Sequence, residues 1–96
     1  MNWAVKFSGT TKRQTQKLPA KVRDAVEFLV ADLESTGPVL PRWPHYGKIV
    51  GHPRCHHCHI LRGRPTYVAV WRETGENEIE VSYVGSHEGA DYGRRC

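Results

Sequence analysis

The stretch from Cys55 to Tyr92 constrains the fold most, because it contains three runs with the character of strands, separated by two turn signals. The middle run, TYVAVWR, is rich in β-branched and aromatic residues, and the last run alternates apolar and polar residues. The sequences RGRP and ETGEN between the runs have the glycine, proline and asparagine that favour hairpin turns. The strands are expected at residues 55–61, 66–72 and 78–85, with 66–72 central to the sheet and with Ile79, Val81 and Tyr83 on one face.

The first half of the chain indicates a strand and two helices. Trp3 to Phe7 alternates as a half-buried strand does, and Ser8 or Thr10 can cap a short polar helix over residues 11–17. A longer helix begins at Leu18-Pro19 and ends at Gly37-Pro38. Its apolar positions recur every three or four residues and form one stripe.

A connector with three prolines follows, and then a short strand is expected over residues 46–51, with His52-Pro53 turning the chain. Residues 1–96 are short enough for a single domain. The predicted fold class is α+β: an N-terminal strand and a two-helix hairpin packed on one face of an antiparallel sheet.

Composition narrows the class of protein. The net charge of +4 favours an anionic partner. Three cysteines are an odd number and argue against a disulfide framework. No apolar run approaches the ~20 residues that span a bilayer, and no signal peptide is recognisable, so we expect a cytoplasmic protein without a membrane partner.

The histidines suggest where chemistry takes place. Side chains two residues apart share a face of a strand, so His57 and His59 lie on one face, roughly 7 Å apart along it, which is close enough to flank one phosphate. His56 falls on the opposite face and is expected to be a hydrogen-bonded framework group. The other polar residues that can converge on the same open face are Arg62, Arg64, His87, Glu88 and Tyr92.

Imidazoles on a basic surface suit acid–base cleavage of RNA. A neutral histidine can take the proton of a 2′-hydroxyl, and a protonated one can give a proton to the leaving 5′-oxygen. Arginine can stabilise the charge that develops on the phosphate, and Tyr92 can stack on a base or take part in the proton transfer. The residues leave open which histidine is the base and which the acid. This scheme requires no metal and no cofactor.

A zinc site is the competing interpretation of Cys55-His56-His57-Cys58-His59, because C-x-x-C is a common ligand pair. The chain has no second closely spaced pair, and on a strand Cys55 and Cys58 point to opposite faces. The same geometry disfavours a disulfide between them, so no metal ligands are assigned.

The helix sequence KLPAKVRDAVEFLVADLE, the strand TYVAVWRE and the ending VSYVGSHEGADY resemble the RelE/ParE superfamily of toxin–antitoxin toxins over nearly the whole chain. The resemblance implies a small basic toxin of the RelE or HigB kind, an mRNA interferase that cuts mRNA in the ribosomal A site without a metal and so inhibits translation. It also implies a cognate antitoxin protein, and operator DNA bound only through the toxin–antitoxin complex.

The resemblance places His57 and His59 at positions where RelE has lysines. It matches His87 to the family's basic residue after the last strand, and Tyr92 to the family's C-terminal tyrosine. Glu88 follows the family pattern. The family's arginine is replaced by Val68, a departure for which an arginine of the hairpin loop could compensate. Contacts with phosphate or ribosomal RNA are assigned to Lys48, Arg62 and Arg64.

Two other functions remain open. A ParE-like protein would inhibit DNA gyrase and would have no use for the histidine cluster. A catalytically inactive module that binds an antitoxin and regulates its operon would explain Val68. Fold alone does not decide between these functions.

Overall fold

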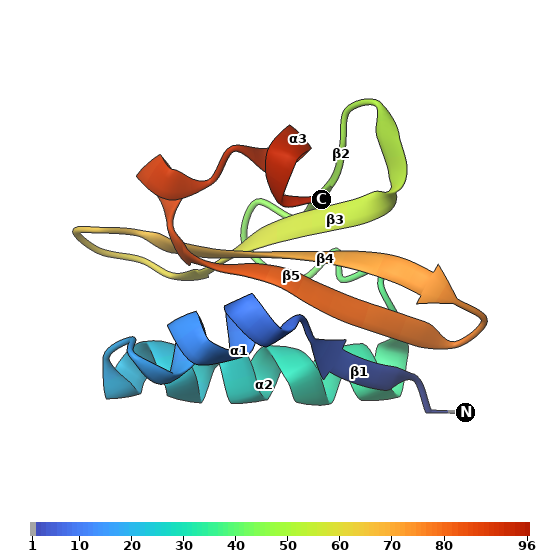
Figure 1. Ribbon diagram of the computed structural model, residues 1–96, viewed down its shortest axis with the longest axis horizontal. Coiled ribbons are helices and arrows are strands. Elements are labelled where there is room, and N and C mark those ends of the chain that lie inside the picture. Colours follow the sequence, from blue (N-terminus) through green and yellow to red (C-terminus); the bar gives the residue numbers. More distant parts are fainter. Residues whose placement is uncertain (1) are drawn as a thin grey trace.

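The structure is a computed structural model that describes residues 2–96 (Figure 1). Its elements, in chain order, are β1 (Ala4–Phe7), α1 (Gly9–Gln16), α2 (Ala20–Thr36), β2 (Gly47–Ile49), β3 (His52–Leu61), β4 (Tyr67–Gly75), β5 (Glu78–Ser86), the 3-10 turn η1 (His87–Gly89) and α3 (Tyr92–Arg95). The expected order of a strand, two helices and consecutive strands is confirmed. The short helix at the C-terminal end is an addition to it.

The five strands form one sheet in the order β1-β5-β4-β3-β2, so β4 is the central strand as predicted. Strands β2 to β5 pair antiparallel. The first strand differs from the prediction of an antiparallel sheet, because β1 pairs with β5 in parallel. Strands β1 and β5 are far apart in the chain, because α1, α2 and three strands lie between them. No hairpin joins the two strands, so they are free to pair in parallel. The fold class is α+β, with a mixed sheet.

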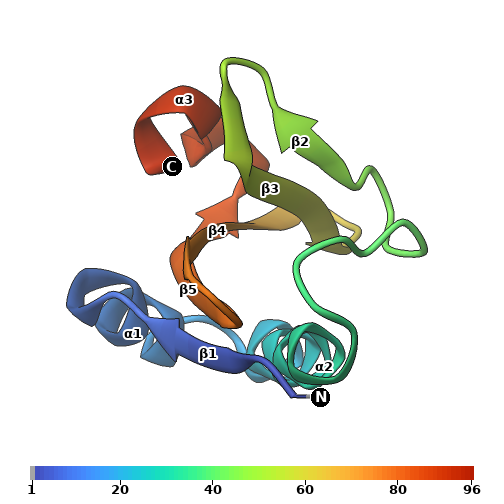
Figure 2. The same ribbon diagram turned by 90° about the vertical axis from the view of Figure 1, so that its right-hand side faces the viewer.

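The two long helices cover one face of the sheet, and α3 lies on the other (Figures 1 and 2). We call the face toward α1 and α2 the inner face and the opposite one the outer face. The inner-face core joins the apolar stripe of α2 to the sheet, and its fully buried residues include Leu29, Leu33, Trp71, Ile79 and Val81.

The helix ends follow the sequence signals. The Ser8 hydroxyl accepts a hydrogen bond from the Thr11 backbone N–H at 3.2 Å and caps α1. Gly37 ends α2 with φ 101°, and a Cβ there would lie 2.9 Å from the indole nitrogen of Trp3. Only glycine combines this backbone conformation with so close an approach.

The predicted facing of β5 is wrong at Tyr83. Val70 pairs with Tyr83 but Trp71 pairs with Val81, so Ser82 is an extra residue that forms a β-bulge. Ile79 and Val81 belong to the inner core, whereas Tyr83 belongs to the outer cluster. The bulge shifts the alternation by one residue, so the residues after Ser82 point to the opposite face from the one predicted.

Two turns also differ from the prediction, the first in position and the second in length. His52 and Pro53 lie inside β3, and the chain turns at Val50 and Gly51 instead, with φ 82° at the glycine. The β4–β5 turn has only two residues between the strands, Glu76 and Asn77, with φ 58° at Asn77. Asparagine tolerates this left-handed conformation, which suits a tight hairpin.

Candidate active site on the outer face of the sheet

Strand β3 distributes its histidines between the two faces as the alternation predicts. Cys58 and Ile60 are part of the inner core, and Cys55 is part of the outer cluster. His57 and His59 therefore share the outer face with Cys55. Both are half-buried. His56, which lies between Cys55 and His57, belongs to neither cluster and is fully buried.

His56 is a framework residue, as expected. Its Nδ1 lies 2.8 Å from the Tyr46 hydroxyl, and its Nε2 lies 2.8 Å from Oε2 of Glu73. Its ring also stacks on Trp71, at 5.9 Å between centroids. Both ring nitrogens are satisfied within the protein, so His56 is not available to a substrate.

The structure brings together four aromatic side chains that were predicted to be catalytic, His57, His59, His87 and Tyr92. The His57 ring stacks on Tyr92, with 4.3 Å between centroids and 21° between planes. His87 lies edge-on to His59 at 5.3 Å and to Tyr92 at 6.4 Å. These residues come from β3, η1 and α3, so the site depends on the return of the chain over the outer face.

A fifth ring, which was not predicted, also belongs to the cluster. His45, in the connector before β2, stacks on His59 with 4.1 Å between centroids and 26° between planes. Its backbone has φ 55°, in the left-handed region. The only signal in the sequence is the residue type, because the connector has no periodicity that would assign His45 to a face.

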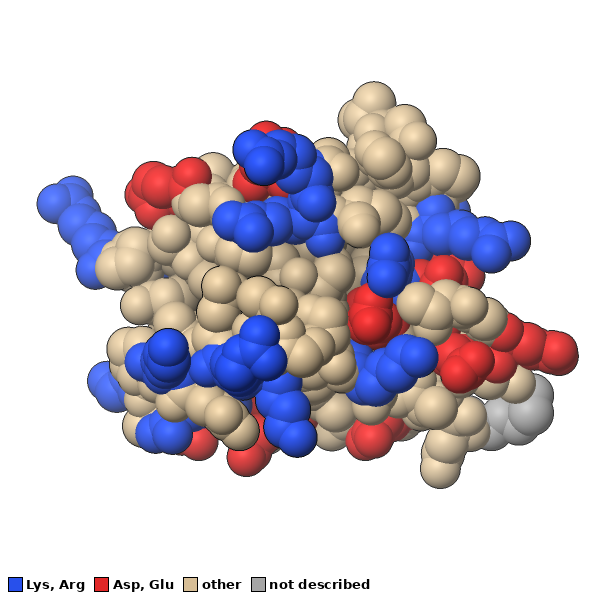
Figure 3. Space-filling view, viewed as in Figure 1, with Lys and Arg blue, Asp and Glu red and all other residues tan. Residues whose placement is uncertain are grey.

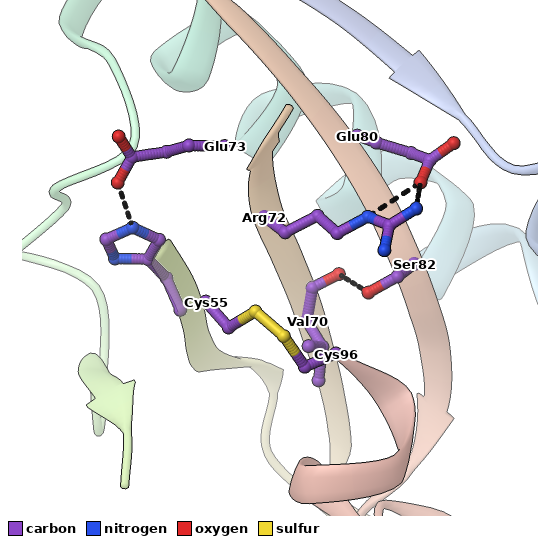
Figure 4. The surroundings of a disulfide bond; sticks show 8 residues. Cys55, Val70, Arg72, Glu73, Glu80, Ser82 and Cys96 are labelled. Atoms are coloured by element: carbon purple, nitrogen blue, oxygen red, sulfur yellow. Dashed lines mark hydrogen bonds and ion pairs between the residues drawn. A yellow bond between two sulfur atoms is a disulfide. The ribbon is translucent and has the colours of Figure 1, made fainter. Parts of the chain in front are cut away.

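A disulfide bond between Cys55 and Cys96 joins β3 to the end of α3 (Figure 4). The odd number of cysteines, which argued against a disulfide framework, therefore does not exclude a single disulfide, whereas Cys55 and Cys58 are not bonded to each other, as expected. The odd cysteine is Cys58, which is fully buried on the inner face. Nothing in the sequence placed Cys96 beside β3, because that contact depends on the fold. The two Cα atoms lie 5.9 Å apart, within the range that a disulfide spans.

The surroundings shift the acid–base behaviour of the site. Burial, and then the neighbouring imidazoles, of which His45 is the first, lower the pKa values of His57 and His59. Burial raises the pKa of the Tyr92 phenol, so it stays protonated near neutral pH. Nδ1 of His57 is buried and has no hydrogen-bond partner among the described residues.

An open pocket lies beside the rings and is lined by His59, Gly63, Arg64, Pro65, Thr66, His87 and Glu88. Arg64 is thus the arginine of the hairpin loop that reaches the site, whereas Arg62 is exposed outside this lining. Val68 pairs with His59 on β4 and is fully buried in the outer cluster, so its position offers no charge to the pocket.

Lys48 lies apart from the cluster. It pairs with His56 on β3, so it is on the side of the strand pair away from His57, which pairs with Gly47. Figure 3 shows lysine and arginine side chains over α1 and near α3, and acidic ones at the end that holds the β4–β5 turn. On the face that Figure 3 shows, basic charge is therefore not confined to the site.

The described residues include no group of three or more histidine, cysteine, aspartate or glutamate side chains placed to hold a metal ion. Cys55 and Cys58 lie on opposite faces of β3, as the alternation requires. In the part of the chain that is described, no helix is long and apolar enough to cross a membrane.

Taken together, the strand order and the helices on the inner face define a RelE-like α+β fold. The free double mutant of the E. coli toxin RelE superposes with a TM-score of 0.73 at 19% identity, over 99% of this chain and 90% of that one. The isolated E. coli RelE toxin gives a TM-score of 0.68 at 19% identity, over 96% and 92%. No protein-family model and no curated protein matches the sequence. The comparisons therefore establish the RelE fold.

Proposed function

We propose that this protein is the toxin of a type II toxin–antitoxin system and that it cuts mRNA on the ribosome. The observation that carries the proposal is the convergence of His57, His59, His87 and Tyr92 on the outer face of a RelE fold. These residues come from three separate elements and have the side chains that acid–base cleavage of RNA requires.

His59 and His87 are the proposed base and acid, because both line the open pocket and their rings are 5.3 Å apart. His59 takes the proton of a ribose 2′-hydroxyl, and the oxygen attacks the adjacent phosphorus. The bond from phosphorus to the 5′-oxygen breaks, and His87 gives that oxygen a proton. The products are a 2′,3′-cyclic phosphate and a 5′-hydroxyl end, so no water or cofactor is consumed.

The lowered pKa of His59 fits this assignment, since a base must be unprotonated at neutral pH. Arg64 lines the same pocket and would contact the phosphate, taking the place of the arginine missing at Val68. Glu88 also lines the pocket, where it could hold the imidazolium of His87. Tyr92 stays protonated and can donate a hydrogen bond to the phosphate or support a base.

Arg62 and Lys48 are exposed outside the pocket, so their proposed role is contact with ribosomal RNA, where point charges set affinity and the salt dependence of binding. The proposed partners are the ribosome with its mRNA and a cognate antitoxin that covers the outer face. Operator DNA would be bound only through the antitoxin complex. The proposed location is the cytoplasm.

The test is expression in bacteria of the wild type and of a His57→Ala, His59→Ala, His87→Ala triple variant, with mRNA ends mapped after induction. His52→Ala is the matched control, because His52 lies on the same strand but is exposed and outside the pocket. New ends within translated frames from the wild type and the control, and none from the triple variant, would support the proposal.

Growth arrest with intact mRNA from all three proteins would overturn it and point to a gyrase-like target. Normal growth with abundant folded protein would indicate an inactive binding module. Purified ribosomes programmed with mRNA that carries one 2′-deoxy residue at a mapped site give a second test. Loss of cleavage at that position alone is expected, because the attacking hydroxyl is then missing.

A further inference from the structure

His45 lies against the ring of the proposed base. The two imidazoles of His45 and His59 are nearly parallel, and their centroids are 4.1 Å apart. His87 also contacts the His59 ring, with 72° between the two planes. The His59 ring is therefore held between a nearly parallel ring and a nearly perpendicular one, and the parallel ring comes from the connector.

The connector holds His45 in place through both of its neighbours. The carbonyl of Pro44 accepts a hydrogen bond from the backbone N–H of His59 at 2.8 Å. On the other side, the Tyr46 hydroxyl bonds to the buried His56 at 2.8 Å. The residues on both sides of His45 are thus hydrogen-bonded to β3, although the His45 side chain is exposed and its backbone φ of 55° is left-handed. Such a conformation costs energy in a non-glycine residue and is often found at functional sites.

The charges around His59 come from several elements. His57 lies on its own strand, and Arg64 lies in the hairpin loop. His87 and Glu88 face the same pocket from η1. Of these groups only Glu88 is acidic, so the surroundings disfavour a proton on His59, and after burial His45 is the largest of the charge effects that lower its pKa.

We propose that His45 is a positioning residue of the active site, which holds the His59 ring at the angle needed to accept the 2′-hydroxyl proton. The same contact brings the two imidazoles so close that a proton on one opposes a proton on the other. This inference rests on the proposed function, since it assigns His59 the role of base. His45 acts in two ways, by the flat contact of its ring and by its charge when protonated. The two can be separated.

Two substitutions separate them. His45→Phe keeps an aromatic ring against His59 but removes the charge. His45→Asn removes the ring, and asparagine tolerates the left-handed backbone, so the connector keeps its path. His52→Asn is the matched control, because it changes an exposed histidine outside the pocket.

The first measurement is the NMR titration of the His59 ring in free protein labelled with ¹³C-histidine, its signal assigned with His59→Gln. Both His45 variants are expected to move the His59 midpoint to higher pH, and His52→Asn is expected to leave it unchanged. An unchanged midpoint in folded His45→Asn and His45→Phe would overturn the inference. If the asparagine variant does not fold, the phenylalanine variant still decides on the charge.

The second measurement is the pH dependence of cleavage on programmed ribosomes. The acid limb is expected to move to higher pH in both variants. At the plateau, His45→Phe should keep its kcat, whereas His45→Asn should lose roughly tenfold, because a misplaced base is costly. Equal loss in both variants would leave no role for the ring contact and would overturn that half of the inference.

Failure of the proposed function gives a different result. If the wild type cuts no RNA but the His59 midpoint still shifts in His45→Asn, the nuclease proposal is wrong and the control of His59 protonation by His45 is retained. If the wild type cuts RNA but neither midpoint nor rate responds, the inference about His45 is wrong and the nuclease proposal stands.

Discussion

Cys96 is bonded to Cys55, and the bond determines how α3 lies on the site. Tyr92 precedes Cys96 by one helical turn and stacks on His57, which follows Cys55 on the same face of β3. A helix of four residues does not hold its shape alone in water. The disulfide and the two ring contacts of α3, Tyr92 on His57 and Arg95 over Tyr83, therefore keep Tyr92 in place.

Reduction of this disulfide is expected to lower the free energy of unfolding. The bond closes a loop with a sequence separation of 41 residues. On the chain-entropy model such a loop contributes ~4 kcal/mol by restricting the unfolded chain. Urea unfolding of the wild type with and without a dithiol reductant measures the difference.

Cys96→Ser provides the control for this prediction. It should unfold at the midpoint of the reduced wild type, and reductant should not change it. Equal midpoints for oxidised and reduced wild type would contradict the prediction. The wild-type ¹³C-histidine spectrum should also change on reduction at His57, because Tyr92 is then free to leave the ring.

The stability of the fold is expected to fall as the pH is lowered below 6.5, the ordinary pKa of histidine. His57 and His59 have lowered pKa values when folded, so between these values and 6.5 the unfolded chain binds more protons. Their contribution is present above that window and is lost within it. Urea unfolding at about pH 7.5 and about pH 5.5 measures the change.

A His57→Phe, His59→Phe variant tests the origin of this effect. Phenylalanine keeps a ring at each position but cannot be protonated, so the fall between the two pH values should be smaller than in the wild type. If the variant loses as much stability as the wild type does, other groups are responsible.

His56→Ala is expected to destabilise the protein by roughly 2–4 kcal/mol, because it leaves a cavity at a fully buried position and removes two hydrogen bonds. Tyr46 and Glu73 both lose a hydrogen bond of 2.8 Å. His52→Ala, on the exposed start of the same strand, should change stability little. Thermal unfolding of both variants compares them, and equal loss would show that His56 is not the framework group.

The sequence predicted the elements well because their signals are local. The apolar stripe of α2, the cap at Ser8 and the alternation of β3 each depend on spacing within one segment. The separation of His56 from His57 and His59 follows from strand geometry alone. The convergence of His87 and Tyr92 on the same face followed from the meander and from the family resemblance.

The features that were missed depend on contacts between distant segments. The stacking of His45 on His59 requires the path of a connector without periodicity. The disulfide requires α3 to lie over β3. The bulge at Ser82 adds one residue without any change in the apolar pattern, so Tyr83 was assigned to the wrong face. Local spacing contains no information on these three points.

Thr11→Val is expected to disturb the site from the opposite face of the sheet. The Thr11 hydroxyl donates to the carbonyl of Ser82 at 2.8 Å, and Thr11 is the buried threonine of α1. Valine has the same shape but leaves that carbonyl without its partner, at a cost of about 1–3 kcal/mol. Thr10→Val is the matched control, because Thr10 is the exposed neighbour on the same helix.

The bulge also determines the alternation of β5 from Ser82 to the start of η1, which carries His87. Loosening it should therefore weaken the contact between His87 and His59, which the ¹³C-histidine spectrum and the rate of RNA cleavage both report. We expect both to change in Thr11→Val and neither in Thr10→Val. Equal stability and equal spectra for the two variants would show that the hydrogen bond from Thr11 does not stabilise the bulge at Ser82.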